Sequence, residues 1–318
     1  MAINEITEQP DKKYLKAGLY TDENKYTTNK NRTRKKIVEK ITENIFLLSS
    51  MISIVSLIII TVFIFINGSG IFFKVGFTNI IFGMEWKPLE GSYGLFPMIL
   101  SSLLVTIGTT FIGVSIGLMT AVLLAEISPK SFSKIIRPAV NLLAGIPSVV
   151  YGFFGLIVIV PIIDSKFGGG GNSILAAIII LGIMILPTII SISETSIRAV
   201  PKEYKEGSLA LGASHIETIF KVILPAAKSG IFAAIVLAMG RAIGETMAVI
   251  LVIGNTPQIP NSLFDRARTL TSNIALEMGY AQGLHQEALF ATGVVLFVFI
   301  MLLNIVLNVF IRKAGENN

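Results

Sequence analysis

Six long stretches of the chain are apolar and almost free of charge, and no other feature constrains its fold as strongly. A helix needs about 20 apolar residues to cross a hydrocarbon core of roughly 30 Å. The six stretches are 22 to 31 residues long, so each can cross once. We therefore predict an all-α, polytopic membrane protein with six transmembrane helices, within residues 45–66, 95–125, 138–163, 168–193, 230–254 and 288–311.

The composition of the 318 residues supports a chain that is dissolved in lipid. Charged residues make up 14% of it, against about 25% in a soluble domain. A transmembrane β-barrel is excluded, because its alternating segments of about 10 residues are missing. The chain has no cysteine and two histidines, and no cluster of histidines and carboxylates. We therefore predict no catalytic residue and no metal site.

The placement of the 26 Lys and Arg residues predicts the orientation of the spans. Counted loop by loop, 20 lie in one set of alternate compartments and 5 in the other, while Arg241 lies inside a span. Because basic residues accumulate on the cytoplasmic side, both termini are predicted to be cytoplasmic. Topology thereby accounts for the net charge of +6, and no nucleic-acid partner is expected.

The polar segments predict how the chain is divided. Residues 1–36 are poor in aliphatic side chains and are expected to be flexible. Trp86 is expected at the membrane surface, where aromatic side chains concentrate. The predicted parts are a polar, basic cytoplasmic tail (1–44), a first transmembrane helix (45–66), an external interfacial segment (67–94), a membrane domain (95–312) and a short cytoplasmic end (313–318).

Proline and glycine interrupt two of the spans. Gly145 and Pro147 lie in the third span, and Pro187 lies in the fourth. Since proline lacks a backbone donor and clashes with the preceding turn, we expect each helix to bend or break there. Such breaks are tolerated where the freed groups are buried in protein or face a watery cavity. They suit a protein that opens and closes, but they also occur in static bundles, so both interpretations stay open.

The longest internal cytoplasmic loop, residues 194–228, contains the signals of two short helices. Pro201 predicts the start of the first helix, and Gly212 predicts its left-handed end. Ser214 begins the second helix with a capping box, and Pro225 closes it. The apolar residues of the second helix share one face: Ile216, Ile219, Phe220, Ile223 and Leu224. Spacing alone favours a stripe that packs on its own bundle, and the alternative is a docking element for a cytoplasmic partner.

Two charged residues lie inside the fifth span. Arg241 and Glu245 are four residues apart and are therefore predicted on one face of a helix. A charge at mid-bilayer costs about 2.5–3.5 kcal/mol, so each should face the bundle interior and have a partner. One interpretation is a salt bridge between helices. The other is a site on a substrate path, in which Arg241 donates hydrogen bonds to an oxyanion and Glu245 orients it. An arginine alone does not distinguish phosphate from sulfate as the substrate.

The cytoplasmic loop resembles a known signature. Its sequence is Glu206-Gly-Ser-Leu-Ala-Leu-Gly212, then nine residues, then Val222-Ile-Leu-Pro225. It is similar to the coupling loop of binding-protein-dependent ABC importer permeases. The resemblance implies contact with a separate ATPase subunit through Glu206, Gly212, Leu224 and Pro225. The chain has no Walker A sequence, so ATP is expected to be used by that partner, with no cofactor bound by this chain.

Four longer motifs resemble phosphate importer permeases of the PstC type. They are Gly145-Ile-Pro-Ser-Val-Val-Tyr-Gly152, Arg241-Ala-Ile-Gly-Glu-Thr246, Arg268-Thr-Leu-Thr-Ser-Asn-Ile-Ala-Leu-Glu-Met-Gly-Tyr280 and Ala288-Leu-Phe-Ala-Thr-Gly-Val-Val-Leu-Phe297. The resemblance implies the type I ABC importer (MetI-like) fold over residues 95–312. It also implies that Arg241 and Glu245 lie on the translocation path of inorganic phosphate.

The same resemblance implies partners and a location. The expected partners are a second permease of the PstA type, an ATPase dimer of the PstB type, an external phosphate-binding protein of the PstS type, and the lipid bilayer of a prokaryotic plasma membrane. Arg268 is expected either to help attract the anion or to lie on a solvated loop face. Two alternative functions stay open: import of another tetrahedral oxyanion such as sulfate, and ion-coupled secondary transport, which predicts internal repeats that we do not find.

Overall fold

The computed structural model describes residues 12–316 of the chain. It divides the chain into two compact units, Met1–Phe63 and Ile64–Asn318. Predictions for residues 1–11 and 317–318 lie outside the described residues. Side chains outside the description are those of residues 12–34, 37, 130, 307, 308 and 310–316.

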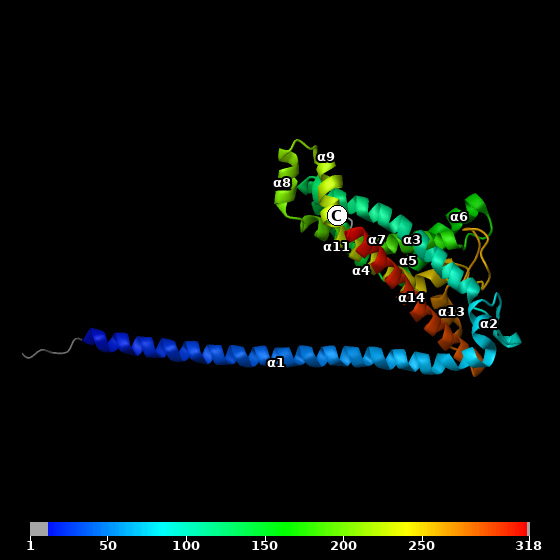
Figure 1. The fold of residues 1–318 in the computed structure, drawn as a ribbon, viewed down its shortest axis with the longest axis horizontal. Coiled ribbons are helices and arrows are strands. Elements are labelled where there is room, and N and C mark those ends of the chain that lie inside the picture. The colour runs from blue at the N-terminus through cyan, green and yellow to red at the C-terminus, as the bar shows by residue number, and fades with distance from the viewer. Residues whose placement is uncertain (1–11, 317–318) are drawn as a thin grey trace, which may run out of the picture. The chain divides into compact units, whose positions relative to one another are not determined.

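Helix α1, Lys12–Ile71, is a single helix of 60 residues (Figure 1). The predicted first span, residues 45–66, lies within it, and the helix extends beyond both ends of that span. A flexible tail is therefore the wrong prediction for residues 12–36, because the polar segment continues the helix. The last part of the tail, Lys35–Glu43, contains several good helix formers and no glycine or proline, which explains why the helix continues from the span into the tail.

A small substructure follows α1 in the second unit. It consists of a π-helical turn, Phe72–Gly76, helix α2, Phe77–Ile81, and a hairpin in which β1, Trp86–Lys87, pairs antiparallel with β2, Ser92–Tyr93. The hairpin packs with α13, Leu270–Glu277, and α14, Leu284–Glu316. Trp86 is buried in this core with 4% of its surface exposed. Its side chain therefore packs inside the protein, and the place of Trp86 at the membrane surface stays a prediction.

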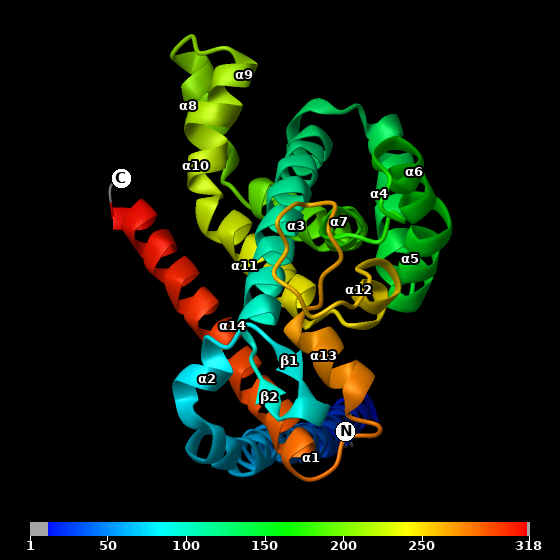
Figure 2. The ribbon, with the colours of Figure 1, turned by 90° about the vertical axis from the view of Figure 1, so that its right-hand side faces the viewer.

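Helices α3, Phe96–Val122, and α7, Ile174–Arg198, pack closely against one another within the second unit (Figure 2). Glycine on α3 permits the close approach: a Cβ on Gly113 would lie 2.5 Å from Cδ1 of Ile185. Helix α7 runs unbroken through Pro187, so no break occurs there. Its other side chains are mostly buried, and this packing holds the helix together where proline removes one hydrogen bond.

The third span breaks where Gly145 and Pro147 predict it. Helix α4, Lys130–Gly145, ends at the glycine, and Pro147 precedes helix α5, Ser148–Phe154. A π-helical turn, Gly155–Ile159, leads into α6, Val160–Phe167. Residues Ser148–Phe167 are long and apolar enough to cross a membrane. Helix α4 is a separate, amphipathic helix, which the sequence did not distinguish from the span.

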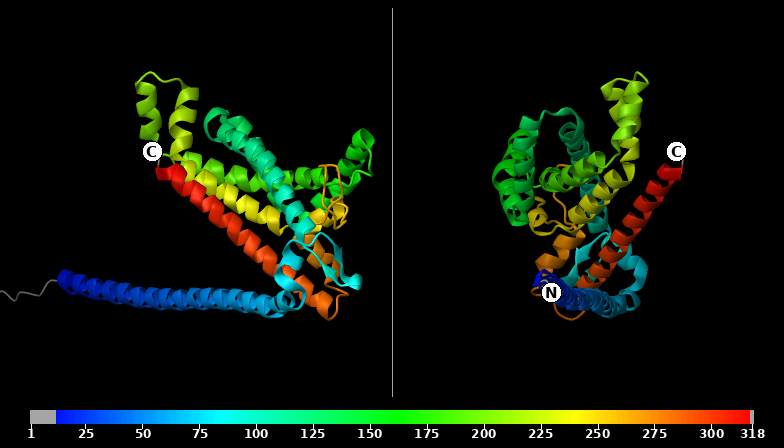
Figure 3. Two further views of the ribbon diagram at one scale, coloured as in Figure 1. Left: turned by 45° about the vertical axis from the view of Figure 1, so that its right-hand side comes forward. Right: turned by 90° about the vertical axis from the view of Figure 1, so that its left-hand side faces the viewer.

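The predicted cytoplasmic loop, residues 194–228, and the fifth span form a bent series of helices. Helix α8, Lys202–Ala210, and α9, His215–Thr218, project as a hairpin from one end of the bundle (Figure 3). A π-helical turn, Ile219–Ile223, and α10, Leu224–Ala226, lead to α11, Lys228–Gly244, and α12, Met247–Val252, follows.

The number of spans agrees with the predicted six if one pair of helices that meet at a bend is counted as a single span. Five helices in the described part of the chain are long and apolar enough to cross a membrane. The sixth span is the pair His215–Ala226 and Lys228–Gly244, which meet at 69°. The prediction that one continuous helix covers residues 230–254 is wrong, because α11 ends at Gly244.

Candidate functional site

Arg241 lies in the last turn of α11, next to the end of the helix. Its side chain is exposed, and Nη1 donates a 3.4 Å hydrogen bond to the hydroxyl of Thr188 on α7. A Cβ added at Gly240 or at Gly244 would meet no atom within 4 Å. The guanidinium is exposed, and its other N–H donors remain available to a ligand.

Glu245 does not share a helical face with Arg241, which corrects the sequence prediction. It follows the end of α11 with extended backbone angles, φ −72° and ψ 130°. Its Oε1 accepts a 3.2 Å hydrogen bond from the N–H of Ala248 in α12. Its main-chain oxygen accepts another, also 3.2 Å, from the hydroxyl of Thr271. Glu245 thus stabilises the start of α12, and a gap in the helix separates it from Arg241.

The break in the third span packs against the break in the fifth. Pro147 has no N–H to donate to the carbonyl of Leu143, four residues earlier. The hydroxyl of Tyr151 donates a 2.7 Å hydrogen bond to that carbonyl instead. On the next residue, a Cβ added at Gly152 would lie 2.7 Å from the Cα of Ala248. The first of the two motifs, Gly145–Gly152, is therefore packed closely against α12, which begins directly after the second motif, Arg241–Thr246.

The corner between α8 and α9 has the predicted geometry. Gly212 adopts φ +88°, and its N–H donates to the carbonyl of Leu209 at 3.0 Å. The N–H of Ala213 reaches back to Ser208 at 3.2 Å, which completes a Schellman motif. The predicted capping box at Ser214 is present. Pro225 does not end the second helix, which continues for one more residue, to Ala226.

The apolar stripe of the loop divides into two parts. Ile219 and Ile223 are buried against the ends of α3 and α7, so this part packs on its own bundle. Ile216 and Phe220 are exposed, the latter by 61%. Packing on the own bundle is confirmed for the buried residues, and docking of a partner on the exposed ones stays a prediction. Of the predicted coupling residues, Glu206 and Pro225 are also exposed, and Leu224 is partly buried.

Arg268 lies in a buried polar network and has little exposed surface. Its Nε donates to the carbonyl of Asn255 at 2.8 Å, and its Nη1 donates to Glu277 at 2.5 Å and to Asn273 at 3.0 Å. This geometry gives Arg268 a structural role and does not present it to an incoming anion. Both predictions for Arg268, a place on a solvated loop face and a role in attracting the anion, are therefore wrong.

Glu277 is the centre of that network, and sequence reasoning missed it. Its Oε2 accepts hydrogen bonds from Nε1 of Trp86 at 2.9 Å and pairs with Nε2 of His285 at 2.8 Å. Burial raises the pKa of the Glu277 carboxyl, but the hydrogen bonds from Trp86, His285 and Arg268 outweigh burial and hold the pKa below its usual range. No local spacing connects these residues, so only the tertiary fold reveals the cluster.

Known proteins share this sequence and fold. A family model for the inner membrane component of binding-protein-dependent transport systems matches residues 113–315. The probable ABC transporter permease protein YqgH of Bacillus subtilis (strain 168) is 43% identical over 80% of this chain and 86% of its own length. The phosphate transport system permease protein PstC of Haemophilus influenzae is 35% identical over 73% of this chain and 80% of its own length.

A solved structure of the inward-facing MetNI methionine ABC transporter has the same fold. It aligns with a TM-score of 0.56 over 69% of this chain and 95% of the matched chain, at 22% identity. The likeness confirms the all-α, MetI-like architecture. Together with the family match over most of the chain, it leads to one conclusion: the chain belongs to the binding-protein-dependent transport system inner membrane components, and it is a multi-pass permease subunit of an ABC importer, not an enzyme.

Proposed function

We propose that this chain is the permease subunit of an ATP-driven importer of inorganic phosphate and forms half of its translocation pathway. The observation that carries the proposal is the exposed guanidinium of Arg241, which lies where α11 ends and the fifth span is interrupted. A guanidinium offers two parallel donors that suit a tetrahedral oxyanion. The similarity to a phosphate transport permease over 73% of the chain favours phosphate over other oxyanions.

Glu245 supplies a physical reason for selecting phosphate over sulfate. An ionised carboxylate accepts hydrogen bonds and cannot donate them. Hydrogen phosphate carries an O–H donor near neutral pH, whereas sulfate carries none. A carboxylate on the path therefore orients protonated phosphate and repels sulfate. Import of sulfate remains the second candidate, because the guanidinium of Arg241 alone suits either anion.

The permease of an ABC importer works with a second permease, an ATPase and a binding protein. We propose that these are of the PstA, PstB and PstS types, that the PstB-type dimer uses the ATP, and that this chain binds no cofactor. Residues Glu206, Gly212, Leu224 and Pro225 would contact the ATPase at the exposed end of the loop, with both termini in the cytoplasm. The break at Gly145 and Pro147 would let the path open and close, with Pro187 as a second point of bending.

Uptake of radiolabelled phosphate and sulfate by vesicles that contain the assembled transporter, with and without ATP, tests the proposal. Arg241→Ala should lower ATP-dependent phosphate uptake by about 10- to 100-fold, because that factor corresponds to the free energy of one charge-assisted hydrogen bond. Arg241→Lys should restore only part of it, since an ammonium lacks the planar fork. Glu245→Gln should narrow the preference for phosphate over sulfate. Lys166→Ala is the matched control, because Lys166 is exposed and outside the site. Wild-type uptake by Arg241→Ala would refute the site.

A further inference from the structure

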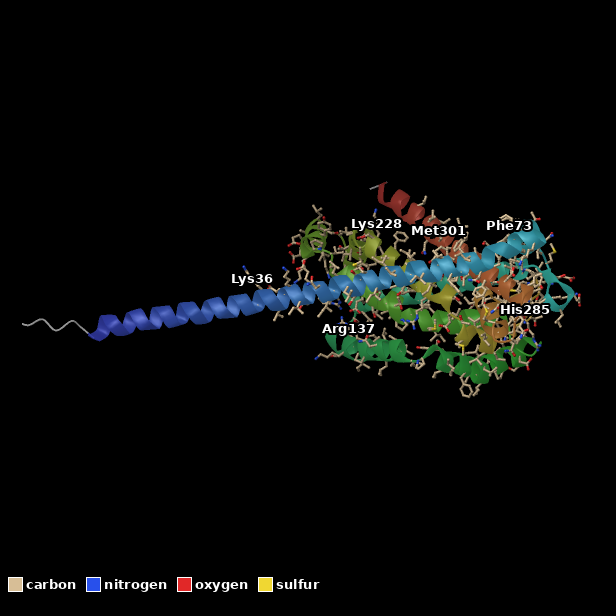
Figure 4. All side chains as sticks on the ribbon, turned by 90° about the horizontal axis from the view of Figure 1, so that it is seen from below. Lys36, Phe73, Arg137, Lys228, His285 and Met301 are labelled. Carbon is tan, nitrogen blue, oxygen red and sulfur yellow. The ribbon has the colours of Figure 1, made fainter. Side chains whose placement is uncertain are left out.

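Two arginines share one carboxylate at the end of the bundle that carries the coupling loop. Nη2 of Arg137, on α4, lies 2.5 Å from Oε1 of Glu194 on α7, and Nε of Arg198 lies 2.9 Å from the same oxygen. Glu194 is nearly buried, whereas the arginine side chains are 44% and 46% exposed. In Figure 4, Arg137 lies toward the same end of the second unit as Lys228, and far from His285. One carboxylate thus holds two guanidinium groups that still face solvent.

A hollow of about 440 Å³ lies beside this pair. It is bounded by the π-helical turn Leu123–Ile127 at the end of α3, by the start of α4 and by Arg198, and Lys134 also lines it. Glu126, at the rim, already pairs with Lys205 at 2.5 Å. Lys134 has no ion-pair partner among the side chains that the structure describes. Three cations line the hollow, Lys134, Arg137 and Arg198. The two arginines share the single charge of Glu194, and Glu126 is paired with Lys205, which leaves two positive charges uncompensated.

The hollow also offers hydroxyl donors. Ser128 and Ser133 line it, with their oxygens 2.6 Å apart. Since one hydroxyl of such a pair donates to the other, the second keeps its proton for a ligand. Guanidinium, ammonium and hydroxyl donors that line one hollow suit the oxygens of a phosphate group, which accept several charge-assisted hydrogen bonds.

Helix α4 points to where such a group could come from. Lys134 and Arg137 lie on one face of the helix, while Phe132 and Ile135 are exposed on another. A helix with one basic and one apolar face suits the boundary between headgroups and acyl chains. Basic hollows between helices at the cytoplasmic end of a membrane protein also suit phosphate headgroups.

We propose that the hollow between α3, α4 and Arg198 binds a phosphate group, carried either by an anionic lipid or by free inorganic phosphate. Arg137, Arg198 and Lys134 hold its oxygens, and the Ser128–Ser133 pair donates a further hydrogen bond. The site lies away from Arg241 in the sequence and uses none of the residues assigned to the path, so it stands whether or not the transported ion is phosphate.

The test uses the assembled transporter with Arg241→Ala in every sample, so that the proposed path does not contribute to binding. In the lipid arm, the complex is reconstituted in phosphatidylcholine vesicles with and without phosphatidylglycerol, extracted gently, and weighed by native mass spectrometry for retained lipid. In the phosphate arm, lipid-depleted complex in detergent is dialysed against radiolabelled phosphate. Lys134→Gln removes one charge without touching Glu194, Arg137→Gln removes a guanidinium, and Lys166→Gln is the control.

We expect Lys134→Gln and Arg137→Gln to lower binding by about tenfold in at least one arm, and Lys166→Gln to leave it unchanged. A loss in the lipid arm identifies a headgroup, and a loss in the phosphate arm identifies the free ion. The proposal is overturned if neither ligand binds, or if both variants bind as the parent does in both arms. In that case the arginines serve only to hold Glu194.

Discussion

The indole Nε1 of Trp86 donates a 2.9 Å hydrogen bond to Oε2 of Glu277, and the two residues are 191 positions apart. The bond joins the hairpin that follows the first span to the helix that precedes the last. Because Arg268 and His285 pair with the same carboxylate, Glu277 is the point at which three segments of the second unit meet. A nearly buried carboxylate with charged and polar donors is costly to disrupt.

Replacing Glu277 by Gln should destabilise this end of the protein. The amide keeps the shape of the side chain but loses the charge that offsets Arg268, and one of its ends can only donate. We expect a loss of about 3 kcal/mol, typical of breaking a buried ion pair. The measurement is the thermal midpoint of the purified protein. Glu287→Gln is the control, since the pair of Glu287 with Lys74 is more exposed and should be worth less than about 1 kcal/mol.

The same carboxyl predicts a loss of stability in acid. The pKa of Glu277 in the folded protein lies below its ordinary value of 4.5. A group with a lowered folded pKa contributes stability above its unfolded pKa, and that contribution is lost as the pH falls through the folded value. The thermal midpoint should therefore drop as the pH is lowered from 4.5. The Glu277→Gln variant should show a smaller drop, and equal acid sensitivity of variant and parent would contradict the assignment.

Local signals predicted the parts of this fold that depend on neighbours in the sequence. Gly212 and Ser214 define a corner through backbone conformation and capping, so the structure reproduces them. Glu245 was misplaced because helical spacing assumes an unbroken helix, and Gly244 ends it. The burial of Trp86 was missed because its partner, Glu277, is distant in sequence. No pattern among neighbouring residues indicates such a pairing. A tryptophan between two predicted spans has the same local sequence pattern whether it is buried or lies at the membrane surface.

Gly212 should be required for coupling between ATP hydrolysis and transport. Any residue with a Cβ is strained at φ +88°, by about 1–2 kcal/mol, and a β-branched residue by more. Gly212→Val should therefore distort the corner and raise ATPase activity relative to phosphate uptake. Gly207→Ala is the matched control: Gly207 is inside α8 with open space around it, and alanine should favour the helix slightly. An unchanged ratio of ATP hydrolysed to phosphate taken up in Gly212→Val would argue against a coupling corner.

The contact between Gly152 and Ala248 should be sensitive to a single methyl group. A Cβ at Gly152 would lie 2.7 Å from a backbone atom of α12, so one of the two helices must move. We expect Gly152→Ala to lower the thermal midpoint, with a cost of about 1–3 kcal/mol from overpacking. Because α12 begins at the residues that follow Glu245, the shift should also weaken phosphate uptake. Gly145→Ala introduces the same methyl where no atom lies within 4 Å and should leave the thermal midpoint nearly unchanged. If both variants behave alike, close packing of α5 on α12 is not what positions the two broken helices.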